Sequence, residues 1–131
     1  MMIYKFGFDL HGVLDANPAL VAMAQSLMIH GHEIHVITGQ RLSRELFDQL
    51  EEMCVPYSKV FSISTYYEMM GHRIEWDKNG NPHMDTVMWD RAKGDYCRRE
   101  GIDFHIDDTH HYGHYFQTPI AIMFRRYDHG N

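Results

Sequence analysis

Three aspartates are the side chains of this chain best suited to chemistry. Asp9 ends the apolar run FGFD, and Asp107 with Asp108 ends the run FHIDD. An aspartate at the end of a buried run loses hydration, so a partner must offset that cost. Three carboxylates in a small space repel one another unless a cation lies among them, and oxygen ligands favour a hard ion such as Mg²⁺. We therefore expect Asp9, Asp107 and Asp108 to bind Mg²⁺, although Asp108 alone could simply cap a helix.

A second set of residues is suited to binding phosphate. Thr38 and Gly39 end the run HVITG. A hydroxyl and backbone N–H groups at a strand-to-helix turn can hold an anion, although the same residues also suit an ordinary turn. Lys93 precedes the last aspartates, and its charge could hold a carboxylate and a phosphate together. Lys59 and Lys78 are the alternatives for this lysine.

These residues need a parallel sheet to bring them together. Apolar, β-rich runs predict strands at 2–8, 32–38, 59–64, 102–108 and 119–124. Apolar periodicity with caps predicts helices at 18–30, 43–53 and 85–100. Alternating strands and helices imply right-handed crossovers, and so an α/β, Rossmann-like three-layer sandwich with a mostly parallel sheet and helices on both faces. Ligands of such sheets bind beyond the carboxyl ends of the strands, where Asp9, Thr38 and Asp107 fall.

Residues 65–84 interrupt this alternation. The stretch HRIEWDKNGNPHM predicts two short strands around an asparagine–glycine turn, which we interpret as a small β-hairpin flap inserted into a single domain of residues 1–131. The segment between Asp9 and the first helix is too short for a cap domain, so only the flap can cover the site. Tyr66, Tyr67 and Trp76 could stack there on a base or a ring, or could simply pack.

In order, FDLHGVL, ITG, Lys93 and HIDDTHHY resemble the motifs of the haloacid dehalogenase-like superfamily, which consists mostly of phosphatases and phosphotransferases. The resemblance implies that Asp9 attacks phosphorus and becomes an aspartyl phosphate. It implies that Thr38 binds the phosphoryl oxygens and that Lys93 steadies their charge. It also implies that Mg²⁺ is bound by Asp9, by the backbone carbonyl of His11, and by Asp107 and Asp108 directly or through water.

The sequence departs from that family at His11, where the family usually has an aspartate that acts as general acid and base. The backbone carbonyl is unaffected by this change, whereas the side-chain role is altered. An imidazole can protonate a leaving alkoxide and later accept a proton from water. The alternatives are therefore a working phosphatase with a histidine acid/base, a slow enzyme, and a phosphate- or metal-binding module without turnover. A receiver-type phosphoacceptor domain is disfavoured, because its acidic pair belongs at the first strand.

The composition of the chain limits the cellular compartment and the classes of partner that we expect. The 131 residues are 44% apolar with a net charge of −6, which disfavours long nucleic acids and anionic membranes as partners. No apolar run approaches the ~18 residues of a membrane span, and the N-terminal residues lack the layout of a signal peptide. Cys54 and Cys97 are predicted to be buried, unpaired thiols. We expect a cytoplasmic protein acting on a small phosphorylated substrate, such as a nucleotide or a sugar phosphate.

Overall fold

The main sheet has five strands that all pair in parallel, in the order β3-β2-β1-β6-β7. The computed structural model describes residues 2–124. The strands are β1 (Lys5–Asp9), β2 (Glu33–Thr38), β3 (Lys59–Ser62), β6 (Phe104–Asp107) and β7 (Ile120–Ile122). The central strands β1, β2 and β6 are apolar and mostly buried, as expected of strands covered on both faces. The predicted α/β class and parallel sheet are confirmed.

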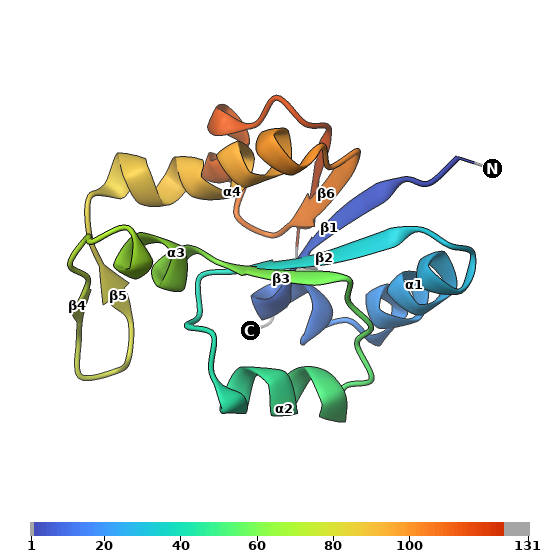
Figure 1. The fold of residues 1–131 in the computed structure, drawn as a ribbon, viewed down its shortest axis with the longest axis horizontal. Helices are drawn as coiled ribbons and strands as arrows, with labels where there is room; N and C mark the ends of the chain where they lie inside the picture. The colour runs from blue at the N-terminus through green and yellow to red at the C-terminus, as the bar shows by residue number, and fades with distance from the viewer. Residues whose placement is uncertain (1, 125–131) are drawn as a thin grey trace, which may run out of the picture.

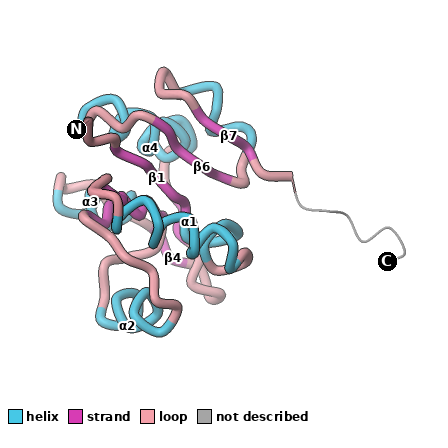
Figure 2. The backbone as a smooth tube through the Cα atoms, turned by 90° about the vertical axis from the view of Figure 1, so that its right-hand side faces the viewer, coloured by secondary structure: helices cyan, strands magenta, loops and turns pink. Residues whose placement is uncertain are grey.

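Helices cover both faces of this sheet, as Figures 1 and 2 show from two directions. They are α1 (Pro18–Ile29), α2 (Arg44–Glu52), α3 (Ile63–Met69) and α4 (Thr86–Glu100). Residues of α1 and α2, such as Ala24 and Leu46, pack with Phe8 and Val36 on one face. Residues of α3 and α4 form a second apolar cluster with Ile37 on the other face. The molecule is thus the predicted three-layer sandwich.

Local side-chain bonds define where the helices begin. The Asn17 side chain accepts a hydrogen bond from the Ala19 N–H, the Ser43 hydroxyl accepts one from Leu46, and the Asp85 carboxylate accepts one from Met88. Each cap satisfies a backbone donor that has no partner within its helix. At the other end of α4, Gly101 adopts a left-handed conformation (φ 70°) that stops the helix. The three predicted helices are confirmed within a residue or two.

The predicted strand at 59–64 is wrong beyond Ser62, because α3 begins at Ile63. The Ser62 hydroxyl accepts a hydrogen bond from the Thr65 N–H and caps this helix, and Ile63 and Tyr67 turn to the same apolar cluster. The flap prediction therefore holds only for its later part. There β4 (Glu75–Trp76) and β5 (Pro82–His83) form an antiparallel hairpin that projects beside α3 (Figure 1).

The start of the first strand and one of the two cysteines differ from prediction. The first strand begins at Lys5 rather than Met2, since Met2 and Ile3 are exposed and lie outside the sheet. Both cysteines are free thiols, as predicted, and Cys97 is buried. Cys54 is exposed, contrary to prediction, because it lies in the turn after α2 with φ 58°. Among residues 2–124, no helix is both long and apolar enough to cross a bilayer.

Candidate active site

The carboxyl ends of three neighbouring strands place the predicted chemical residues together. Asp9 ends β1, Thr38 ends the adjacent β2, and Asp107 ends β6 on the other side of β1. A cleft of about 760 Å³ opens at this edge. Six of the seven predicted residues line it: Asp9, His11, Thr38, Gly39, Lys93 and Asp108. Asp107, the seventh, is completely buried behind Lys93.

Lys93 joins two of the carboxylates. Its ammonium nitrogen lies 2.9 Å from Asp9 Oδ1 and 2.9 Å from Asp107 Oδ2, and only 3% of the residue is exposed. Burial lowers the pKa of Lys93, but the two carboxylates raise it by more than burial lowers it. The net shift of the pKa is upward, and the side chain stays charged. The Tyr112 ring, 5.0 Å from the ammonium, adds a cation–π contact. Of the three lysine candidates, Lys93 is therefore the one that lies among the predicted carboxylates.

The two alternative lysines lie elsewhere. Lys59 begins β3, at the opposite end of that strand from the cleft, and its ammonium forms a surface ion pair with Glu100 at 3.0 Å. Lys78 is exposed in the turn of the hairpin and does not line the cleft.

The Asp107 carboxylate is saturated with hydrogen-bond donors. Its Oδ1 accepts from the backbone N–H groups of Asp108 (2.8 Å) and Thr109 (3.2 Å). Its Oδ2 accepts from Lys93 and from His105 Nε2, each at 2.9 Å. A carboxylate offers about four lone-pair sites, so these bonds use all of them. Burial raises the pKa of Asp107, but the donors outweigh it and hold the pKa below its ordinary value.

Asp9 behaves differently from Asp107. Burial raises the pKa of Asp9, and the neighbouring Asp107 and Asp108 raise it further, against the opposing effect of Lys93. One oxygen from each of Asp9, Asp107 and Asp108 lies within 4.8 Å of the others, the one such grouping of His, Cys, Asp or Glu among the described residues. Negative charge is thus concentrated where a cation would relieve it.

His105 supports the site from within the sheet. The imidazole lies in β6 beside Gly7 of β1, and a Cβ at Gly7 would come within 2.6 Å of its Nδ1. The Phe116 ring stacks on it with centroids 5.2 Å apart. Glycine at this position is therefore what admits a histidine that can donate to Asp107. We did not predict His105 as a site residue.

Thr38 and Gly39 form the predicted turn on the opposite side of Asp9. Thr38 is buried, with 2% of the residue exposed. Its hydroxyl accepts a hydrogen bond from the Gln40 N–H at 3.1 Å. The Ser64 hydroxyl donates to the Gly39 carbonyl at 2.7 Å. A Cβ on Gly39 would lie 2.7 Å from the Trp89 ring, so the turn requires glycine for space.

His11 stands at the mouth of the cleft, with 89% of its side chain exposed. Its Nδ1 lies 3.0 Å from Asp15 Oδ2, and the other Asp15 oxygen accepts the Gly12 N–H at 2.7 Å. Gly12 adopts φ 83°, a conformation that favours glycine and that turns the chain between these two residues. Asp15 was not predicted, although its spacing of four residues from His11 is a usable signal.

The flap supplies the outer wall. Trp76 lines the cleft, and the Arg41 guanidinium lies 4.2 Å from the centroid of its ring. Arg41 is also held by both carboxylate oxygens of Glu68, at 3.0 and 2.6 Å. Tyr66 and Tyr67, by contrast, belong to the apolar cluster of α3 and α4 rather than to the cleft. Of the three aromatic candidates, Trp76 alone lines the cleft.

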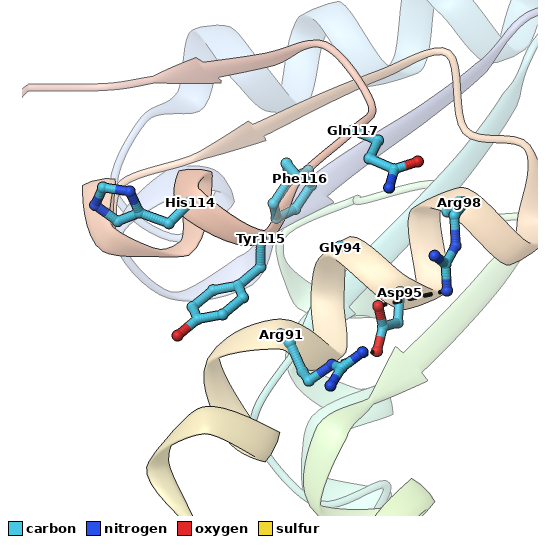
Figure 3. Close-up of a pocket in the computed structure, with 8 residues that line it drawn as sticks. All are labelled: Arg91, Gly94, Asp95, Arg98, His114, Tyr115, Phe116 and Gln117. Carbon is cyan, nitrogen blue, oxygen red and sulfur yellow. Dashed lines mark hydrogen bonds and ion pairs between the residues drawn. The ribbon is translucent and has the colours of Figure 1, made fainter.

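A smaller hollow of about 250 Å³ lies between α4 and residues 114–117 (Figure 3). Asp95 forms ion pairs there with Arg91 at 3.1 Å and with Arg98 at 3.6 Å. Gly94 packs directly against the Tyr115 carbonyl at its edge. Asp95 thus balances one of the two arginine charges, and this hollow holds none of the predicted site residues.

No model of a known protein family matches this chain, and no curated protein matches it in sequence.

Proposed function

We propose that this protein is a Mg²⁺-dependent phosphomonoester hydrolase that forms an aspartyl phosphate on Asp9. The observation that carries the proposal is the position of Asp9 in the cleft. Its carboxylate is bonded to the buried Lys93, stands beside Thr38, and shares its immediate surroundings with two further carboxylates. Phosphoryl transfer needs positioning and neutralised charge more than it needs covalent help, and this arrangement offers both.

The donor set fits a magnesium ion. All candidate ligands are oxygens, which suits a hard cation, and the three carboxylates are already crowded together. Asp9, the His11 carbonyl and Asp108 would bind the ion, while Asp107, whose oxygens are occupied by donors, would hold Lys93 beside it. When bound, Mg²⁺ would neutralise charge on the phosphoryl oxygens.

The residues of the chain divide the chemistry between them. In the first step a carboxylate oxygen of Asp9 forms a bond to phosphorus, and the ester oxygen leaves with its electron pair and takes a proton from His11. In the second step water attacks phosphorus, His11 takes its proton, and the bond between phosphorus and Asp9 breaks. Thr38 and Lys93 hold the phosphoryl oxygens throughout. Both residues are buried, so bulk water does not reach the site from the side of the sheet.

The substrate is a small phosphorylated molecule, such as a nucleotide or a sugar phosphate. A cleft of about 760 Å³ has room for a substantial group beyond the phosphate, and Trp76 offers that group an aromatic wall. Two free thiols are in keeping with a cytoplasmic setting.

Phosphate release from a panel of phosphomonoesters, with and without Mg²⁺, tests the proposal. The expected result is release that requires Mg²⁺ and is lost in Asp9→Asn. Equal release by that variant would remove Asp9 from the mechanism.

His11→Asp tests the side chain that departs from the family pattern. A large loss of release shows that the histidine is the acid/base, and a gain shows that it is a handicap. Absence of any turnover, together with a rise in melting temperature on adding Mg²⁺ or phosphate, would instead identify a binding module.

A further inference from the structure

We infer that Asp15 is a positioning residue that holds the His11 imidazole by Nδ1 and so presents Nε2 to the cleft. This inference rests on the proposed function, because it explains how an exposed histidine can serve as the acid and base of that reaction. It assigns a role to a residue that neither the sequence motifs nor the family resemblance singles out.

The contact is defined at both carboxylate oxygens. Asp15 Oδ2 lies 3.0 Å from His11 Nδ1, and Oδ1 accepts the Gly12 N–H at 2.7 Å. The Asp15 N–H in turn donates to the Leu10 carbonyl at 3.0 Å, which ties the carboxylate to the start of the same loop. The Asp15 side chain is 22% exposed, against 89% for His11. A partly buried carboxylate that also accepts a backbone hydrogen bond therefore holds an exposed ring.

The bond also decides which ring nitrogen carries the proton. An ionised carboxylate can only accept, so His11 Nδ1 must donate, and the neutral ring then has its lone pair on Nε2. Imidazole in water favours the opposite tautomer. Because His11 and Asp15 both line the cleft, the ring nitrogen left for substrate or water is the one that can accept a proton.

The variant Asp15→Asn tests the effect of Asp15 on the His11 ring separately from its effect on the structure of the loop. The amide oxygen of asparagine can still accept the Gly12 N–H, but its NH₂ group would face His11 Nδ1 and favour the tautomer protonated at Nε2. Asp48→Asn, at an exposed position of α2, makes the same change of charge away from the cleft and serves as the matched control.

The first measurement is the tautomer of His11, read from the ¹⁵N chemical shifts of its ring in the metal-free protein. We expect Nδ1 to be protonated in the wild type and in Asp48→Asn, and Nε2 to be protonated in Asp15→Asn. The same tautomer in all three proteins would overturn the inference whether or not the protein is an enzyme.

The second measurement is turnover in a double-mutant cycle with His11→Ala. Asp15→Asn should lower kcat by about 10- to 100-fold with little change in KM, and should cause no further loss in the His11→Ala background. An equal loss in both backgrounds would show a merely structural role. A wild type with the expected tautomer but no turnover on any ester would contradict the proposed function alone.

Discussion

Replacing Lys93 with methionine removes the cation that joins Asp9 and Asp107 and leaves the buried volume nearly unchanged. The ammonium lies 2.9 Å from each carboxylate, and the residue is 3% exposed. Removing one partner of a buried ion pair typically costs about 3–5 kcal/mol, because the remaining charges are left uncompensated. For a domain of this size we expect the melting temperature to fall by roughly 10–20 °C.

Lys59→Met is the matched control, since it breaks an exposed pair between Lys59 and Glu100 with a similar N–O distance of 3.0 Å. Exposed pairs contribute only about 0–1 kcal/mol. Urea unfolding in EDTA, followed by the fluorescence of Trp76 and Trp89, measures both variants. Similar losses for the two lysines would refute the claim that Lys93 neutralises the buried carboxylates.

The loss of folding stability in Lys93→Met, relative to the wild type, should also depend on pH. The pKa of Asp107 is held low in the folded protein, so this carboxylate contributes stability that is present above its unfolded value of 3.8 and is lost as the pH falls through the folded value. Without Lys93 that contribution shrinks. The difference in unfolding free energy between wild type and variant should therefore be largest at about pH 7 and should become smaller below about pH 4. A deficit that is constant over this range would contradict the electrostatic explanation.

Three further outcomes follow from the same geometry. In EDTA, Asp9→Asn should unfold at a higher temperature than the wild type, and this difference should widen as the pH rises. The reason is that the pKa of Asp9 is raised in the folded protein, so ionising Asp9 costs stability. Added Mg²⁺ should raise the unfolding temperature of the wild type but not of the variant. Gly7→Ala should cost about 1–3 kcal/mol in urea unfolding, since its Cβ would lie 2.6 Å from His105 Nδ1, whereas Gly113→Ala, with no atom within 4 Å, should be nearly neutral. Asp77 should titrate at a pKa of about 2 by carbon NMR, because His83 and the backbone N–H groups of Asn81 and Asn79 donate to it, and His83→Ala should raise that value.

The sequence was enough to predict the edge of the sheet at which the site lies. Asp9, Thr38 and Asp107 each follow an apolar run, and parallel strands bring such positions together at one edge. Lys93 is harder to assign from the sequence, because a lone lysine on a helix carries no local mark of burial. Only the packing of α4 against the sheet makes Lys93 face Asp9.

Other features depend on contacts that no short pattern contains. The run ISTYYEM is rich in residues typical of strands, yet Ser62 caps it and Tyr67 packs against α4, so tertiary contacts make it a helix. His105 can donate to Asp107 only because β1 places Gly7 beside it. Asp15 reaches His11 only through the turn that Gly12 permits.

The most direct test of the account is to trap the covalent intermediate. The protein, with Mg²⁺ and a phosphomonoester that it hydrolyses and that is radiolabelled at phosphorus, is quenched in acid during turnover. One half of the sample is digested directly, and the other half is reduced with borohydride before digestion. The account predicts label on the peptide that contains Asp9, lost on reduction as Asp9 is converted to homoserine, and no label in Asp9→Asn. Hydrolysis that leaves Asp9 unlabelled, or a label that resides on His11 or on a serine, would contradict it.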